Sequence, residues 1–65
     1  MRNPDRLDNF YSILRDYHKN FVPDLRFGQL IINFLNWHKA TYYNDCFYVE
    51  DKELAERFGY FINEL

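Results

Sequence analysis

Two histidines and one cysteine are the side chains best suited to metal binding or to nucleophilic catalysis. His18, His38 and Cys46 lie far apart in the sequence, and no two of them have the spacing of three or four residues that joins ligands on one helix. No neighbouring residue pattern places a general base beside Cys46. We therefore expect no metal site, no cofactor, and structural roles for both histidines.

Three acidic residues, Glu50, Asp51 and Glu53, form the densest carboxylate cluster and are the next candidates for chemistry. They coincide with the start of an expected helix, where the helix dipole favours negative charge. The two glycines, Gly28 and Gly59, do not form a phosphate-binding loop. A chain of 65 residues also has little room for an enclosed pocket. The sequence predicts a protein that is not an enzyme.

A basic group lies where the first two expected helices meet, and it consists of Arg15, His18, Lys19 and Arg26. Such a basic corner can contact phosphates. Cations at the end of a helix are also favoured by its dipole and need no ligand. The net charge is −2, so the chain lacks the concentrated basic surface that is typical of nucleic-acid-binding proteins. Nucleic-acid binding through this corner is therefore the alternative function.

The aromatic content is the most informative feature, with seven Phe, six Tyr and one Trp. A three-helix core can absorb most of the phenylalanines, which leaves several Tyr side chains and the Trp at the surface or at its margin. Such side chains are enriched in protein interfaces. They also cover the edges of cores with their polar atoms in water, and both interpretations stay open. The candidate protein interface is Trp37, Tyr42, Tyr43, Tyr48 and Tyr60.

Three helices are expected to position these residues, because apolar side chains recur every three or four positions along three stretches. Asn3, Pro4 and Asp24 are residue types that are typical of helix starts. The pattern predicts an all-α fold, a small three-helix domain over residues 1–65. The expected helices span about residues 4–19, 25–40 and 51–64.

The helix at 25–40 is apolar over a wide arc, which predicts that it lies at the centre of the domain with neighbours on two sides. Residues 46–49 are expected to form a short extended connector with Phe47 and Val49 facing the core. Gly59 interrupts the third helix, and we expect close packing against another helix there.

The size of the chain favours a partner. Domains of this length have small cores and usually need a disulfide, a metal or another subunit, and one cysteine excludes an internal disulfide. The N-terminus lacks the apolar stretch of a signal peptide, and no apolar run is long enough to span a bilayer. We expect a cytoplasmic protein that associates with itself or with another protein.

Two segments are similar to those of a group of short uncharacterised bacterial and phage proteins. Residues 23–31 read PDLRFGQLI and residues 47–54 read FYVEDKEL, which resemble the patterns PDLRxGQLI and FYxEDxEL of that group. Arg2, Asn3 and Pro4 match its usual start, whereas residues 36–43 are more aromatic than the pattern. The resemblance covers nearly the whole chain. It implies a free-standing cytoplasmic protein, often carried by a phage, and no activity.

Together these observations predict a non-enzymatic protein-binding module that self-associates. A phage or mobile-element accessory protein, or an inhibitor of a host protein, is one form of this function. The alternative is a small nucleic-acid-binding regulator that uses the basic corner. We also expect Arg26 to pair with Asp24 or with the acidic residues at 50–53, which would tie the second helix to the third.

Overall fold

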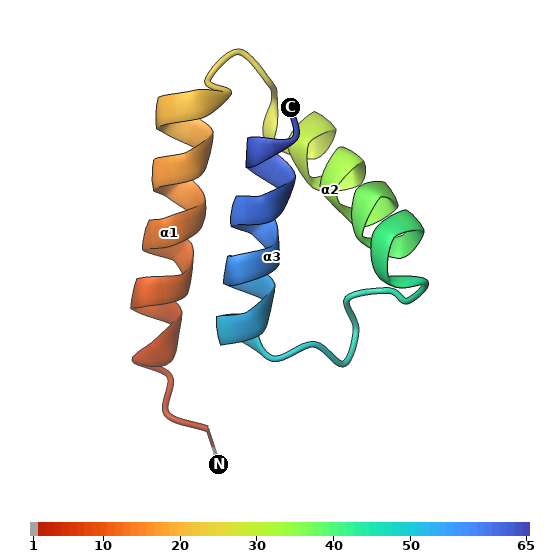
Figure 1. Ribbon diagram of the computed structural model, residues 1–65. Helices are drawn as coiled ribbons and strands as arrows, with labels where there is room; N and C mark the ends of the chain where they lie inside the picture. Colours follow the sequence, from red (N-terminus) through yellow and green to blue (C-terminus); the bar gives the residue numbers. More distant parts are fainter. Residues whose placement is uncertain (1) are drawn as a thin grey trace.

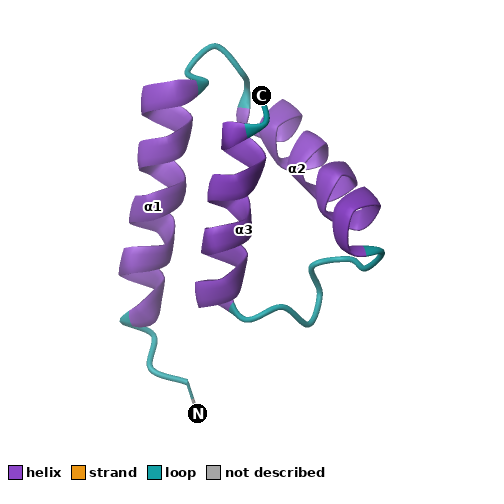
Figure 2. Cartoon of the chain, in the orientation of Figure 1, coloured by secondary structure: helices purple, strands orange, loops and turns teal. Residues whose placement is uncertain are grey.

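The structure is a computed structural model that describes residues 2–65; Met1, the remaining residue of the expected domain, lies outside the described residues. Three α-helices are joined by two loops (Figure 1). Helix and loop account for all of residues 2–65, with no strand among them (Figure 2). The expected all-α three-helix fold is confirmed. The helices are α1, Arg6–Phe21; α2, Phe27–Tyr42; and α3, Asp51–Asn63.

The first helix begins two residues later than expected because Asn3 caps a tight turn that precedes it. The Asn3 side-chain oxygen accepts the Asp5 backbone N–H at 2.9 Å. The Arg6 N–H then bonds to the Asn3 carbonyl at 3.3 Å, three residues back instead of the four of an α-helix. Pro4 lies inside this turn, where its fixed φ is compatible with the backbone.

The second helix is also displaced by two residues, at both of its ends. Arg26, in extended backbone, precedes its first residue, and the Gln29 side chain accepts the Arg26 N–H at 2.8 Å. Asp24 lies in the preceding turn and is not the cap. At the other end the helix continues through Tyr42 until Tyr43 takes left-handed backbone angles, which an α-helix cannot continue.

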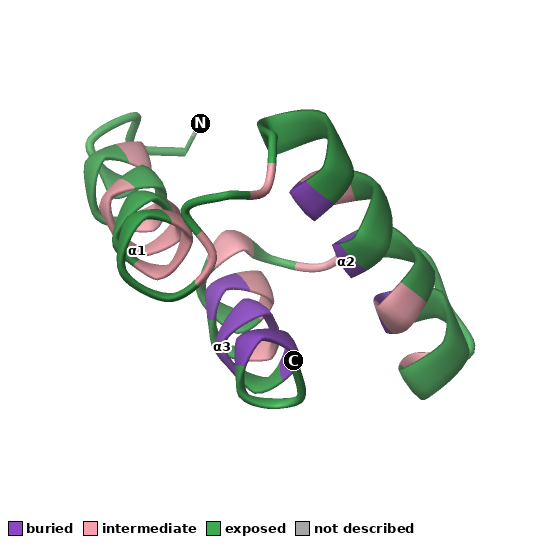
Figure 3. Ribbon diagram, turned by 90° about the horizontal axis from the view of Figure 1, so that it is seen from above, coloured by how far each residue is buried: buried purple, intermediate pink, exposed green. Residues whose placement is uncertain are grey.

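α3 is the central helix, because it packs against both α1 and α2 (Figure 3). The prediction that the helix at 25–40 would be central is wrong. Although α2 is apolar over a wide arc, only the side that faces α3 is buried. α1 contributes no buried residue and contacts the core with half-buried side chains such as Leu14 and Tyr17. The buried apolar cluster comprises Leu30, Phe34, Phe58, Phe61 and Ile62.

α1 packs closely on α3 at Gly59, where the Tyr17 side chain lies against the glycine. A Cβ atom placed on Gly59 would lie 2.7 Å from the Tyr17 hydroxyl oxygen and 3.2 Å from its Cζ. The first distance is shorter than non-bonded atoms tolerate, so a side chain there would displace Tyr17. The close helix packing that the sequence predicted at Gly59 is confirmed. Gly28, by contrast, has nothing within 4 Å of the equivalent position.

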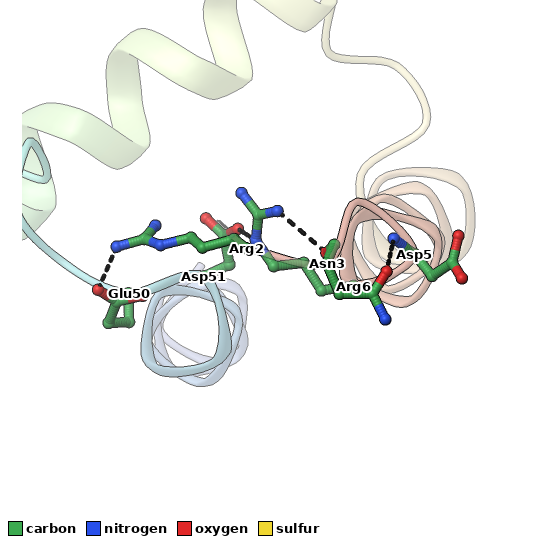
Figure 4. Close-up of polar contacts among 6 residues, drawn as sticks. All are labelled: Arg2, Asn3, Asp5, Arg6, Glu50 and Asp51. Carbon is green, nitrogen blue, oxygen red and sulfur yellow. Dashed lines mark hydrogen bonds and ion pairs between the residues drawn. The ribbon is translucent and has the colours of Figure 1, made fainter.

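The acidic cluster at the start of α3 contacts arginines, and Figure 4 shows two of these ion pairs joining the N-terminal segment to α3. The predicted pairing of Arg26 with this cluster is wrong, since each acid contacts a different arginine. The Arg2–Glu50 pair is exposed and contributes at most about 1 kcal/mol, whereas the other two pairs are partly covered by the fold. The contacts are Glu50–Arg2 at 2.6 Å, Asp51–Arg6 at 3.0 Å and Glu53–Arg57 at 2.6 Å.

Candidate functional site

The loop between α2 and α3 exposes three aromatic side chains. Residues 43–49, here called the aromatic loop, include Tyr43, Phe47 and Tyr48, whose side chains are 91%, 80% and 88% exposed. The Phe47 and Tyr48 rings contact each other edge to face, with centroids 4.8 Å apart. Folding usually buries such rings, so three of them on one short loop form a candidate binding surface.

The aromatic loop turns at the residues that were expected to be extended. The Asp45 carboxylate accepts the Phe47 N–H at 3.0 Å, and the Val49 N–H bonds to the Cys46 carbonyl at 3.2 Å. This turn directs Phe47 into solvent, so the prediction that Phe47 faces the core is wrong. Val49 and Cys46, on either side of the exposed pair, are half-buried.

A buried histidine fixes the start of the aromatic loop. His38 is 0% exposed, and its Nδ1 lies 2.8 Å from the Asn44 carbonyl oxygen. Because a carbonyl only accepts, Nδ1 carries the proton and donates it. The other ring nitrogen, Nε2, then has a free lone pair and accepts from Arg57 Nη1 at 2.8 Å. The neutral Nδ1–H tautomer satisfies both contacts.

Arg57 joins the histidine to the surrounding side chains. Its Nη2 donates to Glu53 at 2.6 Å, and its guanidinium carbon lies 4.0 Å from the centroid of the Tyr42 ring. That ring lies against His38, with centroids 4.8 Å apart. Every buried side-chain N or O atom in the part of the chain that the structure describes has a hydrogen-bond partner. Such a satisfied network fixes the backbone at the start of the loop.

The remaining members of the candidate interface lie in different surroundings. Trp37 is half-buried against Phe34 and Phe61, and its indole N–H donates to Glu64 at 2.8 Å. Tyr42 is half-buried in the Arg57 network, whereas Tyr60 is 58% exposed on α3. Only Tyr43 and Tyr48 belong to the aromatic loop. Phe47, which sequence reasoning placed inside, joins them there.

A groove lies between α1 and the start of α3. Its volume is about 610 Å³. Arg6 and Asp51 line one end of it, and Lys52 and Glu56 line its α3 side. Apolar side chains form much of the lining and are only partly covered by the fold, so a ligand would bury further apolar surface. The partly covered apolar lining residues are Phe10, Ile13 and Tyr17, and Ala55, which also lines the groove, is buried.

A further apolar surface lies on the side of α2 that faces away from α3. The outer face of α2, defined as Ile32 and Leu35, has exposed fractions of 58% and 41%, and Phe27 at the start of the helix is 65% exposed. This face is exposed because α2 packs against α3 alone and α1 does not cover it.

The basic corner is largely engaged in local contacts. Arg15 pairs with Asp16 at 3.1 Å, and the ring Nε2 of His18 donates to the Leu25 carbonyl at 2.7 Å, fastening the α1–α2 loop to α1. Lys19 and Arg26 are exposed at this junction. The structure thus presents two cations here instead of a continuous basic patch.

The chemistry-bearing groups of the chain are dispersed or engaged. Burial raises the pKa of the Cys46 thiol above its ordinary value of 9.0, the Asp45 charge raises it further, and Arg57 opposes both. Such a thiol is protonated at neutral pH and is a poor nucleophile. Residues 2–65 contain no cluster of three His, Cys, Asp or Glu side chains that could hold a metal ion. None of the described helices is sufficiently long and apolar to traverse a lipid bilayer.

No protein-family model matches the sequence, and comparisons with curated proteins and with solved structures gave no match. The resemblance at residues 23–31 and 47–54 therefore stays a prediction.

Proposed function

We propose that this chain is a non-enzymatic protein-binding module that self-associates, with the aromatic loop as its contact surface. The observation that carries the proposal is the exposure of Tyr43, Phe47 and Tyr48, each at least 80% exposed on one loop. Aromatic side chains dominate the energetics of protein interfaces because a rigid ring buries a large area at small entropic cost.

The exposed rings supply part of the area that an interface needs. A Phe or Tyr side chain presents about 150–250 Å², so the three rings expose roughly 500 Å². At about 25 cal/mol per Å², burying them would contribute roughly 12 kcal/mol before the cost of association. That cost is about 4–15 kcal/mol, so the loop supports a reversible complex only if neighbouring contacts add to it.

The hydrogen-bond network beneath the loop reduces the cost of binding. His38 holds the Asn44 carbonyl, and Arg57 holds the other nitrogen of His38. A loop whose start is already fixed in the free protein loses less conformational entropy when it binds. The His38 network thus supports a role of the aromatic loop in recognition.

The residues that could do chemistry also support a binding role. The carboxylates of the cluster at the start of α3 contact arginines, and the Cys46 thiol is protonated at neutral pH. Each of these groups has a structural explanation in the ion pairs and the packing that surround it. Action on a host protein is the form of the function that the sequence resemblance suggests.

The test replaces the exposed pair and measures association. Phe47→Ser/Tyr48→Ser should abolish concentration-dependent dimerisation in light scattering, because it removes roughly 300 Å² of exposed aromatic surface from each copy. Tyr60→Ser, which changes an exposed tyrosine on α3, is the matched control and should leave the mass unchanged. Association of the unmodified protein should persist in high salt, whereas phosphate binding through Lys19 and Arg26 would weaken steeply. A double variant that dimerises as well as the unmodified chain would refute the proposal.

A further inference from the structure

The aromatic loop and the α1–α3 groove lie at the same end of the molecule. Residues 43–49 lead directly into the start of α3, where Asp51 and Lys52 line the groove (Figure 1). One surface projects apolar rings, and the other is an apolar hollow. In a single chain the Phe47 and Tyr48 rings do not occupy the groove, since both are almost fully exposed.

We propose that the α1–α3 groove is the binding site for the aromatic loop of a second copy of this chain, in a reciprocal two-fold dimer. The inference rests on the proposed function and specifies its partner surface. Because each copy carries both a loop and a groove next to each other, a two-fold axis near the start of α3 pairs each loop with the groove of the other copy. Such an isologous contact closes on itself and stops at the dimer.

The area agrees with a reversible dimer. The rings of Phe47 and Tyr48 expose roughly 300 Å² per copy, given about 150–250 Å² for each ring. Each groove exposes less area than the rings do, so two loops in two grooves bury roughly 900 Å² in total, which is the size of a weak, transient interface. The dimer should therefore dissociate on dilution.

The groove offers its occupant space, apolar contacts and one exposed cation. Its volume of about 610 Å³ accommodates the pair of rings, and its partly covered lining of Phe10, Ile13 and Tyr17 offers aromatic and aliphatic contacts. Asp45 of the loop would approach the groove rim, where the exposed Lys52 has no ion pair within residues 2–65. This contact would orient the two copies relative to each other and would contribute little to their affinity, because surface ion pairs are weak.

The test is an intermolecular paramagnetic NMR experiment. A nitroxide is attached to Asn44→Cys/Cys46→Ser, which places one label at an exposed position of the aromatic loop. This chain, without isotope label, is mixed with ¹⁵N-labelled unmodified chain, so that only contacts between copies broaden the signals. We expect broadening at the amides of Phe10, Ile13 and Ala55.

Two variants give the experiment its controls. Adding Phe47→Ser/Tyr48→Ser to the spin-labelled chain should remove the broadening and raise the dimer dissociation constant by roughly thirtyfold or more, as for interface hot spots. Ile32→Ser/Leu35→Ser alters the outer face of α2 instead and should leave both readouts unchanged. Both pairs are exposed, so the variants keep the buried core intact.

Each outcome decides a different statement. Broadening at the groove that depends on Phe47 and Tyr48 supports the inference. A dimer with broadening confined to the outer face of α2, or one weakened by Ile32→Ser/Leu35→Ser alone, overturns both the groove and the proposed role of the aromatic loop. A dimer weakened by the loop variant without broadening at the groove overturns the inference and leaves the proposed function standing. A monomer at millimolar concentration overturns both.

Discussion

The contact between Tyr17 and Gly59 makes a prediction about how α1 is held on α3. Gly59→Ala introduces a Cβ at 2.7 Å from the Tyr17 hydroxyl oxygen, whereas Gly28→Ala introduces one with nothing within 4 Å. Both glycines are helical with negative φ, so alanine gains a similar helix propensity at each, about 0.5–1 kcal/mol. The difference between the two variants therefore isolates the steric effect at Gly59.

The steric effect can be estimated from the surroundings of Tyr17. Its ring contacts Phe58 and Phe21, with centroids 6.0 Å and 5.9 Å apart, so it cannot move without disturbing its neighbours. Overpacking of this kind costs about 1–3 kcal/mol. Gly28→Ala should raise the unfolding free energy by about 0.5–1 kcal/mol. Gly59→Ala should lower it by up to about 2 kcal/mol, because the strain exceeds the propensity gain.

Thermal unfolding followed by circular dichroism measures both variants at one protein concentration, since self-association makes Tm depend on concentration. A change of 1 kcal/mol shifts Tm by about 4–8 °C in a domain of this size, so the two variants should lie on opposite sides of the unmodified chain. Tyr17→Phe combined with Gly59→Ala should recover part of the loss, because the nearest remaining atom is Cζ at 3.2 Å. If Gly59→Ala stabilises as much as Gly28→Ala, α1 does not pack on α3 as described.

Two further predictions concern the aromatic loop and its surroundings. His38→Leu should lower the unfolding free energy by about 2–3 kcal/mol, because it leaves the Asn44 carbonyl and an Arg57 N–H without their partner. Hydrogen exchange at the loop amides should accelerate in this variant, and unchanged exchange would contradict the anchoring role of His38. Alkylation of Cys46 by iodoacetamide should be slow at neutral pH, because burial and Asp45 raise the thiol pKa, and Asp45→Asn should accelerate it. Because the pKa of the Cys46 thiol is higher in the folded than in the unfolded protein, the thiol contributes stability below the unfolded pKa. This contribution is lost as the pH rises through the folded pKa, so alkaline pH should destabilise the protein. A thiol that reacts as fast as free cysteine would contradict this environment.

The helices could be predicted from the sequence because they depend on local periodicity. Apolar residues at intervals of three and four gave three helices within two residues of their observed bounds. Gly59 also indicated a close helix contact, since a glycine in a strong helical pattern usually has a packing reason. The apolar periodicity and the glycine can each be recognised within a single helix.

The arrangement of the helices could not be predicted in the same way. The wide apolar arc of α2 favoured a central position, yet Ile32 and Leu35 belong to that arc and are exposed. A hydrophobic pattern does not distinguish residues that the fold buries from residues that a partner would bury. α3 is central because its buried face includes both Gly59 and Phe58, where α1 and α2 meet it through Tyr17 and Phe34.

The conformation of the aromatic loop could not be predicted from the sequence either. The order Phe47, Tyr48, Val49 favours an extended segment, and its turn depends on Asp45 and on the contact of His38 with Asn44. Since the Arg57 contact to His38 spans 19 residues, no local pattern reveals it. A histidine in the apolar stripe of the second helix was the available signal, because a buried imidazole needs partners for both nitrogens.

The measurement that tests the central claim most directly is the mass of the protein across a dilution series from millimolar to micromolar concentration. Light scattering should show a dimer that dissociates on dilution, and Phe47→Ser/Tyr48→Ser should remain monomeric at every concentration. Ile32→Ser/Leu35→Ser, with an equal number of exposed apolar residues changed on α2, should dimerise like the unmodified chain. A dimer that survives the loss of Phe47 and Tyr48, or a chain that is monomeric throughout, would contradict self-association through the aromatic loop.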